Sequence, residues 1–387
     1  MPFEPATARR TLVGHTAITV RLEQAIADLT ASEGFDAVNP RAIALRAGTS
    51  IRPAYDRYDD RSTIALALWE SIGRDACTSL VIDVAQALVD GDPETASSWI
   101  TTRRTDTVRR NCLRELLLLA AFDAELRSSI HEHLVTRFHS ADPETSVRWV
   151  AALTAAIGLV TDATDLTGPY ELDRPLASVA TAITMEVSPE PLPDVVAAFM
   201  ELQPIATGDS TVDAVLNAAL VAIAHDGYRA TTMDRICERA GLSEGAIFGR
   251  YATKLDLVID IIERRQREAM ATSAAFTADL TVAVGPSATE AVLWREHFRP
   301  EHRPACCFAM EVERLALHEP RLRARLSAAR VMFAVDYLET LEGLPLAEAK
   351  GSVAFGICLG NGLQVMAVLY PEGFTLPFDV VTAGLRL

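Results

Sequence analysis

The sequence of 387 residues has few aromatic side chains, 6% of the total, and only six cysteines. Six cysteines in a chain of this length do not form a disulfide framework, and none has metal-ligand spacing. The adjacent Cys306 and Cys307 are expected to form a buried pair of thiols, because strained vicinal disulfides are rare. Basic residues are outnumbered 52 to 36 by acidic ones, for a formal charge of -16. This balance argues against nonspecific coating of nucleic acid, so any DNA contact needs a local basic patch.

Targeting and membrane segments are also missing from the sequence. The first residues contain no apolar core of a signal peptide. The apolar run at 352–370 carries Asn361 and Gln364 in its middle and is interrupted by glycines. We expect a buried interface helix there, with Gly356 and Gly360 one turn apart allowing close helix approach, rather than a membrane span. The chain is therefore predicted to be cytoplasmic, with no membrane partner.

Motifs of common enzyme classes are absent: the sequence has no P-loop, no nucleotide-binding glycine motif, no HExxH and no GxSxG. His131, His133 and His139 lie near Glu132, which raises the alternative of a metal site. On a helix, positions 131 and 133 point to different faces, so these are expected to be surface histidines. No enzyme activity, cofactor or metal is predicted.

Alanine, leucine, valine and arginine are abundant, which favours an all-α fold. The most informative stretch is 211–257. Apolar residues recur at helical spacing from Val212 to Ile223 and are followed by Gly227, which is expected to end the helix. Thr231 and Thr232 are candidate caps of a second helix, which Gly241 ends, and Ser243 can cap a third. A long helix followed by two short ones predicts a helix-turn-helix.

The segment AGLSEGAIFGRYATKLDL resembles the recognition-helix signature of the TetR family, the tetracycline-repressor-like transcription regulators. The residues that carry the resemblance are Ser243, Gly245, Phe248, Arg250, Tyr251 and Lys254. The pattern is specific as a whole and weak for any residue alone. The resemblance implies a DNA-binding regulator that is released by a small ligand, with repression as the family default.

A second copy of this pattern lies near the N-terminus. A shift of 193 positions places Gly34 on Gly227, Gly48 on Gly241 and Ser50 on Ser243 without a gap. The same shift relates Phe35 to Tyr228, Arg46 to Arg239, Tyr55 to Phe248, Arg57 to Arg250, Tyr58 to Tyr251 and Arg61 to Lys254. Such an ungapped match of core, turn and basic positions predicts a tandem duplication.

The first copy departs from the family pattern at its recognition helix. Asn39 and Pro40 replace the threonine cap, and Arg52 with Pro53 replaces the glycine that permits close backbone approach to a phosphate. Two readings stay open. Arg52 can bind a guanine edge bidentately, or this copy has lost DNA binding and remains as a structural pseudo-domain.

Each copy is followed by a larger helical region, and these regions correspond loosely. Glu115 aligns with Glu311, Leu126-Arg127 with Leu322-Arg323, and Gly158 with Gly362. The predicted organisation is two units joined by a proline-containing linker around a short amphipathic helix. The predicted boundaries are 14–68 for the first helix-turn-helix domain, 69–186 for the first regulatory domain, 187–208 for the linker, 209–257 for the second helix-turn-helix domain and 258–387 for the second regulatory domain.

Homodimers of the family place two recognition helices in successive major grooves, about 34–36 Å apart. The resemblance therefore implies an intramolecular pseudo-dimer, held together by 147–166 and 352–370, with further homodimerisation left open. Its double-stranded DNA operator is expected to be non-palindromic. Arg57, Arg61, Thr232, Arg250 and Lys254, with Tyr55, are the expected phosphate contacts. The other expected DNA-binding residues are Arg41, Ser50, Ile51, Arg52, Asp56, Ser243, Glu244, Gly245, Ala246 and Gly249. Arg9 and Arg10, expected before the first helix, are either a minor-groove arm or a tail.

The regulatory domains of the family usually enclose a pocket for a small molecule. The apolar composition suggests a hydrophobic or amphipathic effector. Candidate lining residues, each of which can equally be core, are Trp99, Phe122, Trp149, Trp294, Phe308 and Phe333. The competing interpretation is a ligand-binding or protein-interaction module whose first DNA-binding head is vestigial.

Overall fold

A computed structural model describes residues 6–103, 105–138, 142–162, 172–243, 245, 247, 249–338 and 345–385. Across these residues every regular element is a helix or a helical turn, so the predicted all-α fold is confirmed. The abundance of alanine and leucine, both strong helix formers, accounts for this.

The first half of the chain begins with the first head, which we define as residues 14–68 and which ends with α4 (Arg61–Leu68) after three earlier helices. They are α1 (Ala6–Glu33), α2 (Pro40–Arg46) and α3 (Arg52–Tyr55), with the turn η1 (Phe35–Ala37) after α1. Because α1 begins at Ala6, Arg9 and Arg10 lie within it rather than before it, and their side chains lie outside the described part. A continuous helical segment follows from Arg61 to Val89, composed of α4 (Arg61–Leu68), η2 (Trp69–Gly73), α5 (Arg74–Cys77), η3 (Thr78–Ile82) and α6 (Asp83–Val89).

The rest of this half and the second half are also helical. The first half ends with α7 (Pro93–Arg103), α8 (Thr107–Leu119), α9 (Ala124–Val135), α10 (Pro143–Thr161) and α11 (Asp173–Thr184). The second head, residues 209–257, contains α12 (Ser210–Ala230), α13 (Met233–Ala240) and the start of α15 (Lys254–Val284). After it come α16 (Pro286–His297), η5 (Pro300–His302), α17 (Arg303–Ala316), α18 (Pro320–Leu338), α19 (Leu346–Leu369), η6 (Pro371–Thr375) and α20 (Asp379–Thr382).

The helix ends in both heads use the predicted residues. The Asn39 side chain accepts a hydrogen bond from the Ala42 amide at 3.1 Å, and Thr232 accepts one from the Arg235 amide at 3.2 Å. Gly227 has φ 78° and breaks the helical path of α12, as its counterpart Gly34 does after α1 with φ 85°. These left-handed angles are cheap only for glycine. The local chemistry of the turns therefore follows the sequence closely.

The linker differs from its prediction. In place of a short amphipathic helix it forms an extended strap whose one regular turn is η4 (Ala198–Met200). Pro191, Pro193 and Pro204 remove amide donors that a helix would need. The strap is held by the second half of the chain: the Arg295 guanidinium donates to the Pro193 carbonyl at 2.8 Å.

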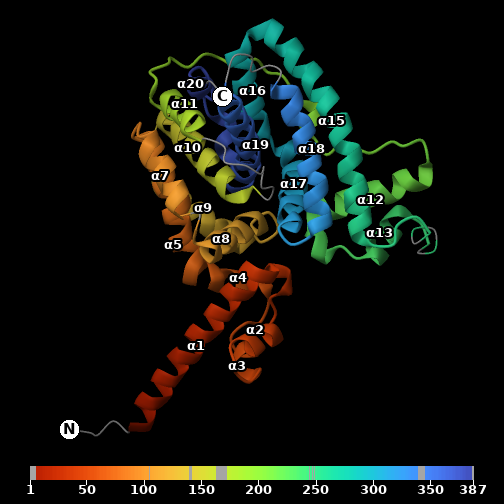
Figure 1. Cartoon of the computed structure of the whole chain (residues 1–387). Coiled ribbons are helices and arrows are strands. Elements are labelled where there is room, and N and C mark those ends of the chain that lie inside the picture. Colours follow the sequence, from red (N-terminus) through yellow and green to blue (C-terminus); the bar gives the residue numbers. More distant parts are fainter. Residues whose placement is uncertain are drawn as a thin grey trace.

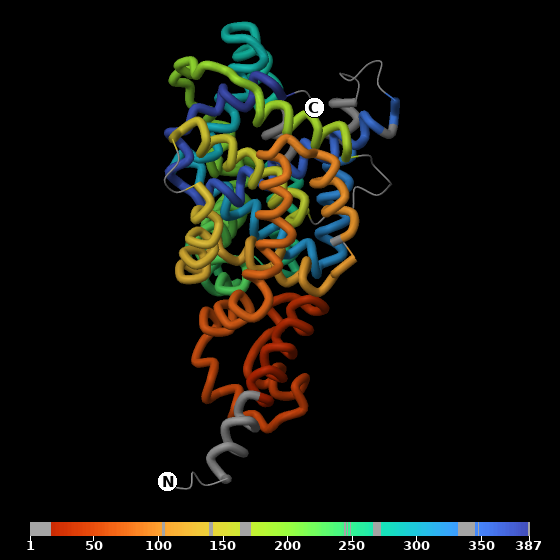
Figure 2. The backbone as a smooth tube through the Cα atoms, turned by 90° about the vertical axis from the view of Figure 1, so that its left-hand side faces the viewer, coloured from red at the N-terminus to blue at the C-terminus, as the bar shows by residue number. Residues whose placement is uncertain are grey.

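Figure 1 shows the first head below a large helical body, with α4 at the junction between them. The second head, with α12 and α13, lies at the right of that body. The view turned by 90° in Figure 2 confirms that the first head projects from one end of the molecule. One hydrophobic core extends from α1 through α10 and on into α16, α19 and α20. The two halves of the chain thus share a core.

The closest helix crossing lies between α10 and α19, the pair predicted to join the two halves. A Cβ atom placed on Gly158 would lie 1.9 Å from the Cys358 carbonyl oxygen, and one on Gly362 would lie 2.0 Å from the Thr154 oxygen. The prediction that Gly356 and Gly360 provide the close approach is wrong, because neither has an atom within 4 Å of such a Cβ.

The apolar composition of α19 has a simple cause. The stretch Glu348–Leu369 is long and apolar enough to cross a membrane, but 78% of its most apolar window is buried inside the protein. Its hydrophobic residues pack against α10, α17 and α18. Burial at this internal interface therefore accounts for the run.

Alanine substitutions at the glycines of α10 and α19 are expected to change stability in opposite directions, depending on the position. Gly158→Ala and Gly362→Ala force two backbones apart and should lower the free energy of unfolding by about 1–3 kcal/mol or more. Gly356→Ala and Gly360→Ala, at open positions of the same helix, should raise it by roughly 0.5–1 kcal/mol. Urea unfolding followed by circular dichroism measures all four. Equal effects at the four positions would contradict the close crossing.

Candidate nucleic-acid interface

The first head presents a row of exposed side chains on α2 and α3. The Arg52 side chain is 87% exposed and lies 3.6 Å from Asp56, its neighbour one turn on. Tyr55 is 56% exposed and Ile51 44%. The remaining predicted contacts on this face, Arg41 and Ser50, are also exposed. These six residues define what we call the first recognition surface.

The arginine that precedes the equivalent tyrosine, Tyr58 or Tyr251, contacts its own head in both copies. Arg57 donates to the Thr19 hydroxyl of α1 at 3.0 Å, and Arg250 pairs with Asp209, the N-cap of α12, at 2.6 Å. The side chains remain partly exposed, Arg57 by 42% and Arg250 by 46%. Tyr58 is buried, which agrees with the core role expected for it. Tyr251 is partly buried and donates to Asp260 at 2.6 Å.

The recognition helix of the second head is described only at some positions. Ser243, Gly245 and Gly249 are exposed, and Ile247 is buried beneath them. Glu244, Ala246 and Phe248 lie outside the described residues, and the first two are expected DNA-binding residues. Thr232 is exposed at the start of α13, where it caps that helix.

Lys254 and Arg61, predicted as phosphate contacts, make internal contacts instead. The Lys254 ammonium donates to the carbonyl oxygens of Tyr228 and Thr231 and lies 3.9 Å from the centre of the Tyr228 ring. Burial lowers the Lys254 pKa, although Asp36 and Glu311 oppose this. The Arg61 guanidinium lies 4.7 Å over the Phe35 ring and pairs with Asp36 at 2.9 Å. Both cations thus have internal partners, and their expected contact with phosphate stays a prediction.

In each head, the backbone amide at the equivalent position binds a buried carboxylate of the body. Glu115 of α8 accepts a hydrogen bond from the Phe35 amide at 3.3 Å, and Glu311 of α17 accepts one from the Tyr228 amide at 2.7 Å. Each carboxylate is 1% exposed. Sequence comparison aligned these two glutamates, but their function as anchors depends on contacts about 80 residues apart in the chain.

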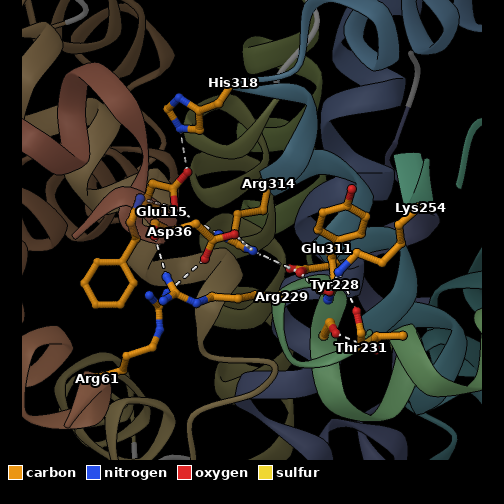
Figure 3. A network of polar contacts seen from close by, with 12 residues as sticks. Asp36, Arg61, Glu115, Tyr228, Arg229, Thr231, Lys254, Glu311, Arg314 and His318 are labelled. Carbon is orange, nitrogen blue, oxygen red and sulfur yellow. Dashed lines mark hydrogen bonds and ion pairs between the residues drawn. The ribbon is translucent and has the colours of Figure 1, made fainter. Parts of the chain in front are cut away.

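Asp36 lies at the centre of a charged cluster where the two heads meet the body (Figure 3). It pairs with Arg61 of its own head and, at 3.0 Å, with Arg314 of α17, and its carbonyl accepts from Arg229 of the second head. Burial disfavours the charged form of Asp36, but Arg314, Arg61 and Arg229 outweigh it and lower the pKa of that carboxyl. Sequence analysis missed Asp36, Arg229 and Arg314, since none is part of a motif.

Arg314 is almost fully buried within this cluster, with a side chain 4% exposed. It donates to Glu311 at 2.7 and 2.9 Å and lies 3.5 Å from Glu115. Burial opposes its charge, yet Glu311 and Glu115 raise the pKa of Arg314 well above the usual range. His318 completes the group by contacting Glu115 at 2.8 Å. One guanidinium thus links both head anchors.

A cavity of about 340 Å³ opens beside this cluster. Of the six predicted ligand contacts, Phe122 lines it. Trp149 stacks on Phe138, Trp294 donates to Glu290 at 2.8 Å, and Phe308 packs in the core of the second head. Trp99 packs against the main core, and the Phe333 side chain lies outside the described part.

The histidines and cysteines have structural surroundings. His131 contacts the Leu369 carbonyl at 2.7 Å and His133 the Thr78 hydroxyl at 3.0 Å, so they diverge as predicted. Both are partly exposed, His131 with 31% of its side chain, and each bonds to a neighbouring element; His139 lies outside the described residues. Cys306 and Cys307 are buried thiols, and burial raises the pKa of Cys306 to about 12.

Comparison with known families identifies one segment. Residues 215–261 match the family described as bacterial regulatory proteins, tetR family. The match runs from the middle of α12 through α13 to the start of α15, which is the second head. No curated protein matches the chain. The second head is therefore similar to a domain of this family of regulators.

Replacement of Arg314 by methionine should lower the free energy of unfolding by about 3–5 kcal/mol, because Glu311 and Glu115 would be left buried without their partner. The matched control is Arg174→Met, which removes a surface arginine, 38% exposed, that pairs with Glu348. Its cost should stay below about 1 kcal/mol. Chemical unfolding of both variants measures the difference, and a similar small loss in both would contradict the anchoring role.

The contribution of Asp36 should depend on pH. Because its folded pKa is lowered, the stability that it supplies is present above its ordinary value of 3.8 and is lost as the pH falls toward the folded value. The difference in unfolding free energy between the wild type and Asp36→Asn should be constant from pH 7 to about 5 and shrink below about 4. Urea unfolding across this range tests it. A difference that grows on acidification would exclude the assignment.

Proposed function

We propose that this chain is a two-headed transcription regulator of the tetR family, built by tandem duplication and acting as an intramolecular pseudo-dimer on double-stranded DNA. The observation that carries the proposal is the family match of the second head together with the recurrence of its contacts in the first. Family members bind DNA and typically dimerise, and a chain with two heads supplies both recognition helices itself.

Equivalent contacts support the duplication. A glycine with positive φ precedes the amide that binds the buried glutamate in each head, Gly34 with Glu115 and Gly227 with Glu311. A cation lies over the following aromatic ring in each, Arg61 over Phe35 and Lys254 over Tyr228. Further along, Arg127 donates to the Ala120 carbonyl at 2.9 Å, and Arg323 donates to that of Ala316 at 2.8 Å. Convergence on so many paired contacts is improbable.

The pairing of helices supports the pseudo-dimer. In a two-fold dimer an element packs against its own symmetry mate. Here α10 crosses α19, and α8 packs against α17, each pair being corresponding helices of the two halves. Asp36 and Arg229 are themselves equivalent positions, and the Arg229 guanidinium donates to the Asp36 backbone carbonyl and also attracts the Asp36 carboxylate. In a homodimer the same contact would join two like residues, whereas two diverged copies allow opposite charges.

The first recognition surface differs from the recognition helix of the second head, which supports a non-palindromic operator. The first carries Arg52 with Ile51 and Asp56, whereas position 245 of the second, equivalent to 52, is an exposed glycine. An arginine can bind the N7 and O6 atoms of guanine, while glycine permits close approach of the backbone. We expect half-sites of different sequence, one for each head. Release from DNA by a small hydrophobic or amphipathic effector, and repression as the outcome, belong to this proposal.

The test uses equivalent substitutions in the two heads. Arg52→Asp and Gly245→Asp place the same carboxylate at matching positions of the recognition surfaces. Lys350→Asp, at an exposed site on α19, is the control for charge. DNA sites selected from a random duplex library by the wild type are then bound by each variant. Each head variant should bind roughly ten- to hundredfold more weakly and lose base preference in one half-site only, and the control should bind normally.

Other outcomes point elsewhere. Perfect inverted repeats among the selected sites would exclude the non-palindromic operator. If only Gly245→Asp weakens binding, the first head is structural, which is the pseudo-domain interpretation. If the wild type selects no specific DNA, the proposed regulator fails, and a ligand-binding or protein-interaction module with a vestigial head becomes the better account of this acidic chain.

A further inference from the structure

The cavity of about 340 Å³ lies where the two heads meet the body rather than inside a regulatory domain. Its walls come from three parts of the chain: Phe35 and Arg61 from the first head, Gly227 and Arg229 from the second, and Phe122 and Arg314 from the body. A site that draws on both heads is sensitive to their relative placement. Its volume lies at the lower end of the range for small-molecule sites, roughly 300–1,000 Å³.

The basic side chains in the wall are not all satisfied. Each nitrogen of the Arg314 guanidinium already has a carboxylate partner in Glu311, Asp36 or Glu115. Arg61 donates from Nη2 to Asp36, but its Nη1 atom is buried and has no acceptor among the described residues. An unmet buried donor on a guanidinium is costly, and an anionic acceptor in the cavity would satisfy it once the Arg61 side chain turns toward the cavity.

Repulsion among the arginines of the cluster also favours the binding of an anion. Arg61, Arg229 and Arg314 all act on the single carboxylate of Asp36. Burial, together with repulsion by Arg229, lowers the pKa of Arg61 despite its pairing with Asp36. A further negative group between Arg61 and Arg229 would relieve both effects.

The remaining wall limits the kind of anion. Four carboxylates also line the cavity. Asp36 and Glu311 are paired with Arg61 and Arg314, whereas Asp123 and Asp226 would repel a dianion such as a phosphate ester. Phe35, Phe122 and Leu119 offer an apolar surface next to the arginines. A planar guanidinium matches a carboxylate through two parallel hydrogen bonds. The wall thus offers a ligand one contact for an anionic group and a surface for an apolar part.

We propose that this cavity binds a small organic monocarboxylate, with its carboxylate between Arg61 and Arg229 and its apolar part against Phe35 and Phe122. The ligand contacts both heads at once, so its binding alters their separation. That last consequence rests on the proposed DNA-binding function, whereas binding without DNA tests the site alone.

Isothermal titration calorimetry of the full chain, without DNA, tests the site. The probes are benzoate, phenylacetate and octanoate, compared with inorganic phosphate and benzylamine. At least one carboxylate should bind saturably, at one molecule per chain, and at least tenfold more tightly than phosphate or benzylamine. Failure of all three carboxylates to bind, or equal binding of benzylamine, would overturn the proposal.

Three variants locate the binding. Arg61→Gln should weaken it at least tenfold, whereas Asp226→Asn, which removes a negative charge from the wall, should leave it equal or tighter. Arg74→Gln is the control, since this exposed arginine lies on the same helical segment and pairs with Glu70 away from the cavity. Because Asp226 makes its described contact with the neighbouring His225 only, its variant keeps the test valid if Arg61→Gln fails to fold. Weakening by Asp226→Asn, or no effect of Arg61→Gln in a folded protein, would place the ligand elsewhere and refute the site.

Discussion

The contact between the backbones of α10 and α19 is the constraint on which the rest of the structure depends. Gly158 lies against the Cys358 carbonyl and Gly362 against that of Thr154, so neither position has room for a Cβ atom. The hydrophobic core continues across this crossing from the first half of the chain into the second. Since both heads are attached to the body around it, the orientation of one head relative to the other is set by this packing and by the contacts of the heads with α8 and α17.

Those contacts are mostly polar and buried. Glu115 and Glu311 each accept from a backbone amide of a head, and Arg314 pairs with both carboxylates from one position. A buried charge is tolerated when it is paired and hydrogen-bonded, and its removal leaves partners that cannot recover water. The same group of residues therefore joins the heads to the body and makes the junction sensitive to any new charge. A charged ligand in the neighbouring cavity would act on this junction directly.

The exposed and the buried basic residues of the heads have separate tasks. Arg52 and Arg41 stand in solvent on the first recognition surface. Arg61 and Lys254 are turned inward over aromatic rings and onto carbonyl or carboxylate oxygens. In the proposed regulator the first kind reads DNA and the second kind keeps the recognition helices in place. Charge alone, counted along the sequence, does not separate the two.

The sequence by itself determined the helices, their caps and glycine ends, the match between the two heads, and α10 with α19 as the helices between the halves. These follow from local rules of backbone geometry and from periodic hydrophobic patterns, which act over a few residues. Only the tertiary structure decided that Gly158 and Gly362, not Gly356 and Gly360, make the crossing, and that Lys254 points inward. It also brought Asp36, Arg229 and Arg314 together. Such choices depend on the rotation of one helix against another and on partners far apart in the chain, and no local pattern encodes either.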